Sequence, residues 1–382
     1  MYPTISHLLF DLFGINIPLP IQTFGFWVAI SFLAASYVIT KELKRKENEG
    51  YLSVSTVKET IGKPLSIYEI LISFFTGFLI GFKLIEAIFH YSDLVANPQD
   101  FILSTRGSFI GGIFIASLSI YLKWNENKKT RLVTLKEIEK KIHPYELVGN
   151  MTMIAAVSGI IGAKVFHNLE NMESFIADPV GQFISFSGLT FYGGLIVGAY
   201  SVIWYARRYK INTLHLIDSA APGLILAYGI GRIGCQMSGD GDWGIDNLAP
   251  KPEWMSFLPD WTWSFTFPNN VINAGIPIEG CVGNFCRELS NPVWPTAFYE
   301  VVMCLLIFSF MWSIRKKIRV PGILFCIYLA LNGIERFFIE KIRINTEYNI
   351  LGGITQAEII SSSLIFVSLI GSIYLVRNFK KI

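Results

Sequence analysis

Long apolar runs separated by short polar segments extend along the whole chain. Each run is about 20 residues long, which is the length that an α-helix needs to cross the hydrocarbon core of a bilayer. The pattern predicts an all-α polytopic membrane protein, formed as a single membrane domain over residues 1–382. Nine membrane-spanning helices are expected, at approximately 22–40, 68–90, 107–124, 145–168, 188–206, 214–236, 295–314, 321–340 and 354–376.

The composition supports this fold class. Hydrophobic residues make up 52% of the chain and charged residues only 16%, which is too few charges for an ordinary soluble domain. We therefore expect membrane lipids as partners and no nucleic acid.

Lysine and arginine are distributed unevenly, and this predicts the orientation, because basic loops stay on the cytoplasmic side. With an outer amino terminus, 23 of the 32 basic residues fall in inner segments. The carboxyl terminus is then cytoplasmic, and a long outer loop lies between spans six and seven. The first apolar run lacks a basic leader, so we expect no cleavable signal peptide.

Residues 68–124 resemble residues 145–206 at an offset of 81 to 82 positions. The matched segments are Gly77–Lys83 with Ser158–Lys164 and Gly107–Gly112 with Leu189–Gly194. Both copies enter the membrane in the same direction, unlike the inverted repeats of many transporters. Because the second copy has Tyr192 where the first has Ile110, we expect the second copy to carry the chemistry. Independent small-residue helix packing is the alternative explanation.

The segment 237–293 is predicted to form an outer cap loop. It holds seven acidic residues against two basic ones, and four tryptophans, which suit the head-group level of a membrane. The loop is expected to cover a site at the membrane edge, or to be a purely structural cap. Cys281 and Cys286 would face an oxidising compartment, so a disulfide and a pair of free thiols are both open. No spacing of histidine and cysteine indicates a metal site.

The segment Tyr228–Gly244 places Arg232 near the outer end of the sixth predicted span and then breaks into glycines and acids. A cation inside a bilayer is costly and usually serves an anionic ligand, so we expect a phosphate or phospholipid head group here. The glycines would allow backbone amides to approach that anion. An arginine that snorkels to the interface is the alternative.

Arg336, Glu340 and Arg343 are spaced by four and three residues, so they share one face of a helix. Two guanidinium groups on that face could hold a phosphate while the carboxylate orients them. An internal ladder of ion pairs at a helix end is the alternative.

Tyr192, followed by Gly193 and Gly194, opens the fifth predicted span and offers a hydroxyl, although interfacial tyrosines often serve only as anchors. Glu300 lies inside the hydrocarbon boundary and needs a partner, for which Arg232 and Arg336 are the candidates. The remaining charges inside spans are expected to pair among themselves, and they include Lys83, Glu86, Glu146, Lys164 and Asp218.

Together, and in their order along the chain, these motifs resemble those of the prolipoprotein diacylglyceryl transferases of bacterial membranes. The resemblance covers most of the chain and rests on four motifs, which are Gly-x-Gly-Arg-x-Gly at 229–234, aromatic-Gly-Gly at 192–194, Pro-x-x-x-Tyr-Glu at 295–300 and Arg-Phe-x-x-Glu-x-x-Arg at 336–343. Thr355-Gln356 resembles the family's glutamine-bearing helix start, and Thr23-Phe24-Gly25 resembles its aromatic-Gly pair in the first span.

The resemblance implies an enzyme of the bacterial inner (cytoplasmic) membrane whose active site faces the outer leaflet. Such an enzyme transfers the diacylglyceryl group of phosphatidylglycerol to the lipobox cysteine thiol of a prolipoprotein signal peptide and releases glycerol phosphate, with no cofactor. The implied catalytic residues are Arg232, Arg336, Tyr192 and Glu340. The implied substrate-binding residues are Phe24, Gly193, Gly194, Gly231, Arg232, Gly234, Ser238, Gly239, Asp240, Trp243, Gly244, Tyr299, Glu300, Arg343 and Gln356.

The chain departs from the family at several positions. Tyr192 stands where the family has a candidate histidine base, Cys235 and Ser238 replace asparagines, the segment 240–243 is one residue longer, and two spans exceed the family core of seven. Tyr192, His167 and a positive pocket that activates the thiol directly remain open as explanations for loss of the thiol proton. A secondary transporter and a non-catalytic phospholipid-binding protein are the alternative functions.

Overall fold

The computed structural model describes residues 1–15, 17–132, 135–185, 188, 190–344, 347–348 and 353–379. These residues are mostly helical, and nine of the helices that they form contain 18 residues or more and follow the nine predicted spans in order. They are α2 (Thr23–Asn48), α3 (Ile67–Phe89), α6 (Phe109–Thr130), α7 (Val148–Glu170), α10 (Phe191–Arg208), α11 (Thr213–Ser238), α12 (Thr296–Ile314), α13 (Ile323–Glu340) and α14 (Gln356–Phe379).

Within the described residues, six helical segments are long and apolar enough to cross a membrane. They are α2, α3, α7 with its preceding turn η1 (Pro144–Leu147), α11, α12 and α14. The protein is therefore a polytopic membrane protein. A membrane crossing by α6, α10 and α13 stays a prediction, since α10 ends in two arginines, α13 contains three charged residues and α6 ends in a polar, basic turn.

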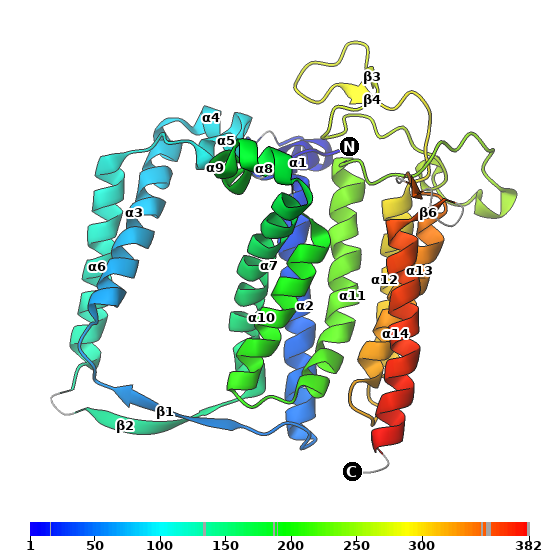
Figure 1. Ribbon diagram of the computed structural model, residues 1–382. Coiled ribbons are helices and arrows are strands. Elements are labelled where there is room, and N and C mark those ends of the chain that lie inside the picture. Colours follow the sequence, from blue (N-terminus) through cyan, green and yellow to red (C-terminus); the bar gives the residue numbers. More distant parts are fainter. Residues whose placement is uncertain are drawn as a thin grey trace.

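Helix α11 lies at the centre of the helical bundle and packs against α2, α12 and α13, while α13 packs against α14 (Figure 1). Small residues allow the close approach of α11 to α2, because a Cβ atom at Gly223 would lie 3.2 Å from the carbonyl oxygen of Ala35. Between α11, α12 and α13 the core is apolar, with Ile225, Cys304 and Leu324 buried. These contacts fix the helices that carry the candidate site.

Two hairpins share one architecture. Between α3 and α6 lie the short helices α4 (Tyr91–Ala96) and α5 (Pro98–Leu103), and between α7 and α10 lie α8 (Met172–Ala177) and α9 (Pro179–Ile184). Each hairpin closes on a glycine contact: a Cβ atom at Gly81 would lie 2.3 Å from the carbonyl oxygen of Gly111, and one at Gly162 would lie 2.5 Å from that of Gly193. No larger residue fits either seam.

A lysine occupies the matching position in each hairpin. Lys83 Nζ donates hydrogen bonds to the carbonyl oxygens of Ser104, at 2.6 Å, and Arg106, at 2.7 Å. Lys164, 81 positions later, donates to the Ser185 hydroxyl at 2.9 Å, and Ser185 is itself 81 positions after Ser104. The two hairpins thus use the same side chain to fix the end of their second short helix.

The predicted pairing among the charged residues inside spans is wrong for two of them. Lys83 bonds to carbonyl oxygens, and Asp218 forms an ion pair at 3.6 Å with Lys46, which was not in the predicted set. Asp218 also accepts the backbone N–H groups of Gly322 and Phe325 at 2.7 and 2.9 Å. Backbone groups at helix ends satisfy these charges as well as opposite charges would.

An antiparallel ribbon connects the two hairpins at the end remote from the cap loop (Figure 1). It pairs β1 (Ser55–Ile61) with β2 (Lys136–Ile142), in a register that sets Ser55 opposite Ile142. The apolar pattern of the sequence predicts helices and no strands, so this ribbon is an addition to the predicted fold. The remaining strands are short pairs, β3 (Ile276–Pro277) with β4 (Arg287–Glu288) and β5 (Glu347–Tyr348) with β6 (Ile354–Thr355).

The cap loop lies at the end of the bundle that also holds the amino terminus and the short helix α1 (Ile5–Phe13) (Figure 1). It contains the turns η2 (Glu253–Met255) and η3 (Asp260–Thr262) and a small core of Trp243, Phe267 and Val293. Cys281 and Cys286 form a disulfide, so the alternative of two free thiols is wrong. The N-terminal ammonium donates to the Pro268 carbonyl at 2.7 Å, which ties the start of the chain to the loop.

Candidate functional site

The end of α11 turns the cap loop back toward the bundle. Gly239 adopts a left-handed conformation, with φ of 65°, and its N–H donates to the Cys235 carbonyl at 3.0 Å, which caps the helix. Gly241 also has a positive φ, of 102°. Only glycine adopts such conformations freely, and the two turns carry Asp242 back to Arg232.

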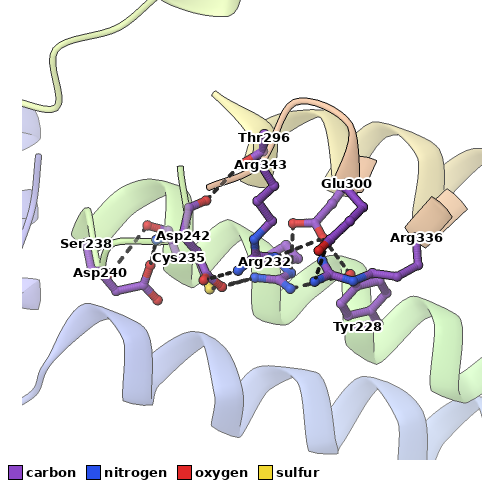
Figure 2. Close-up of polar contacts among 11 residues, drawn as sticks. Tyr228, Arg232, Cys235, Ser238, Asp240, Asp242, Thr296, Glu300, Arg336 and Arg343 are labelled. Carbon is purple, nitrogen blue, oxygen red and sulfur yellow. Dashed lines mark hydrogen bonds and ion pairs between the residues drawn. The ribbon is translucent and has the colours of Figure 1, made fainter. Parts of the chain in front are cut away.

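Arg232 is held inward by a set of polar partners (Figure 2). Its guanidinium forms an ion pair with Asp242, and its Nε atom lies 3.0 Å from Glu300 Oε2. Its Nη2 atom donates to the Tyr228 hydroxyl at 3.4 Å. With only 14% of the side chain exposed, Arg232 does not snorkel to the surface as the alternative interpretation would require.

Glu300, which is fully buried, joins three arginines from different segments. Besides Arg232, its Oε1 atom accepts a hydrogen bond from Arg336 at 3.4 Å and lies 3.7 Å from Arg343. The Tyr228 hydroxyl donates to the same oxygen at 2.6 Å. The predicted pairing of Glu300 with Arg232 or Arg336 is confirmed, since it contacts both.

Arg343 follows α13 and is placed by the cap loop. Gly244 forms a β-bridge with Arg343, and a Cβ atom at Gly244 would lie only 2.3 Å from the carbonyl oxygen of Ile342. The Arg343 guanidinium pairs with the same Asp242 carboxylate that binds Arg232. Glycine at 244 is therefore needed for this close approach.

We call this group the arginine–carboxylate cluster, and it comprises Arg232, Arg336, Arg343, Asp242, Glu300 and Glu340. Arg336 completes it through a 3.0 Å ion pair with Glu340, one turn later on α13. Three guanidinium groups thus face three carboxylates. The expected positive pocket is in fact balanced in charge, because buried cations in a membrane protein require such partners.

The two acids of the cap loop have opposite electrostatic environments. Burial alone would raise the pKa of Asp242, but Arg232 and Arg343 outweigh it and hold that pKa below its ordinary value. Burial raises the pKa of Asp240, whose Oδ1 atom accepts the backbone N–H of Asp242 at 3.2 Å. Asp242 therefore keeps its negative charge to lower pH than Asp240 does.

Cys235, Asp240 and Asp242 also bring three potential metal-ligand atoms within 4.8 Å of one another. The Asp242 oxygens are already bound by Arg232 and Arg343, so a metal ion there would face two cations at close range. The donor set is a poor fit for a metal ion.

Tyr192 lies at the start of α10, half-buried, and within electrostatic range of Arg336 and Glu340. The two glycines after it pack closely against α7. A Cβ atom at Gly193 would lie 2.4 Å from that of Phe166, and one at Gly194 would lie 3.0 Å from a carbonyl oxygen of α7. This packing requires glycine at both positions, and their binding role stays a prediction.

Three other predicted binding residues contact the protein itself. Trp243 is buried in the cap-loop core against Phe267, with ring centroids 5.1 Å apart. The Tyr299 hydroxyl donates to the Thr262 carbonyl at 2.9 Å, and the Ser238 hydroxyl bonds to its own helix. These contacts stabilise the cap loop and the end of α11, and a binding role for the three residues stays a prediction.

The remaining predicted residues differ in position. A Cβ atom at Gly231 would meet no heavy atom within 4 Å, so space is open beside Arg232. Gly234 packs against Phe24 and Trp27 of α2, and the Phe24 ring is 42% exposed. Gln356 is exposed at the start of α14, and within the described part of the chain it forms no hydrogen bond to the arginine–carboxylate cluster.

Four residues of the site lie outside the predicted set, namely Tyr228, Thr296, Glu335 and the cluster member Asp242. Tyr228 precedes Arg232 by one helical turn, so its place on the same face was available as a signal. The pairing of Asp242 depends on the two glycine turns, and the Thr296 hydroxyl donates to the Asp242 carbonyl at 2.9 Å. Glu335 is buried beside the cluster, and neither of its carboxylate oxygens has a hydrogen-bond partner among the described residues.

Comparison with known proteins identifies the family to which the chain is similar. The family model for prolipoprotein diacylglyceryl transferase matches residues 129–374. Three similar proteins carry the name phosphatidylglycerol–prolipoprotein diacylglyceryl transferase. The one from Dehalococcoides mccartyi is 30% identical over 62% of this chain and 80% of its own length. The one from Corynebacterium glutamicum is 29% identical over 61% and 70%, and the one from Clostridium botulinum is 30% identical over 62% and 82%.

The family match begins almost at the end of α6, so the first hairpin lies outside it. The matched residues include α7, α10 to α13 and every member of the arginine–carboxylate cluster. The chain belongs to the prolipoprotein diacylglyceryl transferase family.

Proposed function

We propose that this protein transfers the diacylglyceryl group of phosphatidylglycerol to the lipobox cysteine thiol of a prolipoprotein. The observation that carries the proposal is the convergence of Arg232, Arg336 and Arg343 from three segments onto the buried Glu300. A guanidinium group has five N–H donors, so three of them offer more donors than the paired carboxylates can occupy. Arg232 is also not fully enclosed, since 14% of its side chain is exposed.

The proposed orientation places the cluster at the outer leaflet of the bacterial inner membrane. Nine spans with an outer amino terminus put the cap loop outside, and a disulfide in that loop suits an oxidising compartment. The basic segment Arg315–Arg319 after α12 then lies in the cytoplasm, as the distribution of positive charge requires.

The reaction forms a carbon–sulfur bond and breaks a carbon–oxygen bond. The cysteine sulfur attacks the carbon of the diacylglyceryl group that carries the phosphate ester. The glycerol phosphate departs with the electrons of the broken carbon–oxygen bond. The proton of the thiol ends on the departing phosphate or in solvent. Negative charge grows on the phosphate oxygen in the transition state, and preorganised guanidinium groups stabilise it there.

The residues divide this work between them. Arg232 and Arg336 contact the phosphate, and Glu300 holds their guanidinium planes in fixed positions. Glu340 orients Arg336 from one turn away, and Tyr192 offers a hydroxyl beside that pair to position the phosphate or the thiol. The cluster has as many carboxylates as guanidinium groups, so it has no excess positive charge to stabilise a thiolate. We therefore expect it to activate the leaving group more than it activates the thiol.

A transporter would usually place its charges near the membrane midplane. The arginine–carboxylate cluster lies where α11 and α13 end, beneath the cap loop (Figures 1 and 2), which favours a site for a head group. The experiment below distinguishes the enzyme from a lipid-binding protein without catalytic activity.

The direct test incubates purified protein with phosphatidylglycerol and a precursor peptide and measures the thioether product by mass spectrometry. Arg232→Ala should lower the rate by about 100-fold or more, the scale on which removal of one transition-state donor acts. Arg207→Ala, an exposed arginine on α10 outside the cluster, is the matched control. The proposal is rejected if the wild-type protein forms no thioether or if the two variants are equally active.

A further inference from the structure

A pocket of about 420 Å³ lies beside the cap loop, separate from the arginine–carboxylate cluster. Its volume falls in the usual range for ligand sites. Five segments form its walls, which are α1 with the residues before it, the segment 18–22, the junction of α4 and α5, the cap loop at Val271, and the tip of the disulfide loop. The first hairpin therefore contributes a wall through Val95, Ala96 and Pro98.

Direct contacts join these walls. The Tyr91 hydroxyl of α4 donates to the Pro18 carbonyl at 2.6 Å, which fixes the first hairpin to the N-terminal segment. The Ser6 hydroxyl accepts the Leu19 N–H at 2.7 Å, and the ring of His7 stands edge-on to Phe285, with centroids 6.1 Å apart. The pocket is thus formed before any ligand arrives.

The chemistry of the lining indicates an uncharged ligand with hydrogen-bonding groups. Among the described residues, no aspartate, glutamate, lysine or arginine lines the pocket, and most of its surface is proline, aliphatic or aromatic. Thr4, Ser6 and His7 already form hydrogen bonds within the walls, so the side-chain amides of Gln22 and Asn284 are the polar groups turned to a ligand. Both amides can donate to and accept from the backbone of an extended polypeptide, whereas an acyl chain would offer them no hydrogen-bond partner.

Backbone hydrogen bonds tie the chain around the pocket to the end of α11. Val271, which lines it, donates its N–H to the Ser238 carbonyl at 3.0 Å, and Tyr2 donates to the Met237 carbonyl at 2.8 Å. Arg232 lies six residues before Ser238, which is about 9 Å along the helix axis. An extended peptide covers that length with about three residues.

We propose that this pocket, which we call the acceptor pocket, binds the polypeptide of the protein substrate within a few residues of the cysteine that is modified. The inference rests on the proposed function, since it names where that reaction holds its acceptor. It also gives the first hairpin a role: the duplicated unit supplies a wall of the acceptor pocket and takes no part in the chemistry.

Ala96→Trp tests the proposal because it places a large side chain in the pocket wall. Ala177, 81 positions later, ends the matching helix α8 and is not among the pocket residues, so Ala177→Trp is the matched control. We expect Ala96→Trp to raise the KM for the precursor peptide about tenfold, which corresponds to about 1.4 kcal/mol of lost binding. The KM for phosphatidylglycerol and the rates of Ala177→Trp should stay at wild-type values.

Photo-crosslinking gives a second measurement that needs no variant. A precursor peptide with a photoreactive residue two positions from its cysteine should attach to residues 1–22, 91–98 or 284–285 of the wild-type protein, and unlabelled peptide should compete. Attachment only elsewhere overturns the proposal, as does equal peptide KM in the two tryptophan variants, or a rise in the lipid KM instead. Absence of thioether product with wild-type protein rejects the proposed function, whereas the crosslinks still report on the acceptor pocket.

Discussion

The contrast between two buried glutamates shows how individual side chains are satisfied in this bundle. Glu300 and Glu335 are 0% and 3% exposed, and they lie on adjacent helices. Glu300 contacts three arginines and a tyrosine hydroxyl, whereas the Glu335 oxygens have no hydrogen-bond partner within the described residues. The cost of burying the carboxylate is therefore offset by polar contacts at Glu300 and is not offset by hydrogen bonds within the described residues at Glu335.

Glu300→Gln should destabilise the protein strongly. Removal of the carboxylate leaves three guanidinium groups without their common partner, and breaking a buried ion pair costs about 3 kcal/mol or more. Thermal unfolding of the purified protein in detergent measures this as a large fall in Tm together with loss of transferase activity. A variant with unchanged Tm would show that the arginines do not depend on Glu300.

Glu335→Leu should act in the opposite direction. A buried polar group without a hydrogen bond costs about 1 to 3 kcal/mol, and leucine fills a similar volume without that cost. We expect a higher Tm than wild type in the same assay. A lower Tm would mean that the Glu335 carboxyl has an energetically important role that its contacts do not reveal.

Asp242 provides a prediction about pH. Its two arginines lower its folded-state pKa, so its ion pairs stabilise the protein fully above the ordinary aspartate pKa of about 3.9, and this contribution is lost as the pH falls further. Wild-type Tm should therefore fall more steeply than that of Asp242→Asn as the pH falls from about 4 towards 2. Parallel curves would contradict the ion-pair assignment.

The contacts of these side chains were predictable from the sequence to different degrees. Glu300 was predictable because a lone carboxylate inside an apolar run requires a cation, and few cations lie inside spans. The close approach at Gly193 and Gly194 was predictable, but glycine does not identify what approaches, which in the structure is α7. Asp242 depends on positive φ angles at Gly239 and Gly241, which bring residues ten positions apart into contact.

At the scale of elements, equivalent glycines in the two hairpins offer a matched pair of variants. Gly193→Leu would force α10 away from Phe166 and move Tyr192, while Gly111→Leu would force α6 away from Ile85 in the first hairpin. Small displacements of catalytic groups are costly, so we expect Gly193→Leu to lower kcat about tenfold or more. Gly111→Leu should leave kcat near its wild-type value, and equal loss in both variants would mean that the first hairpin also supports the chemistry.

The elements themselves were predictable to different degrees. Nine apolar runs correspond to nine long helices within the described residues, because the length of a span is set by the bilayer. The ribbon of β1 and β2 was missed, since its strands are short, charged and about 80 residues apart, and neither alternates apolar and polar residues clearly. The short helices at the tips of the hairpins are too brief for a periodic pattern to reveal.

At the scale of the whole molecule, the two ends of the bundle differ in character. One end holds the amino terminus, the disulfide-closed cap loop, the arginine–carboxylate cluster and the acceptor pocket. The other holds the ribbon and most of the basic residues. A lipid head group and a secreted precursor would both reach the first end from the outer face, so the proposed chemistry depends on the orientation of the chain.

Single cysteines read by a membrane-impermeant maleimide test that orientation. Leu248→Cys in the cap loop is exposed and should react in intact cells, whereas the exposed Lys317→Cys after α12 should react only after lysis. Gln99→Cys in α5 and Glu59→Cys in β1 extend the test to the first hairpin, because nine spans require Gln99 outside and Glu59 inside. If both first-hairpin positions react from the same side, α3 and α6 do not each cross the membrane. If Leu248→Cys reacts only after lysis, the cap loop is cytoplasmic, and the outer-leaflet site would be wrong even for a protein that still forms the thioether in detergent.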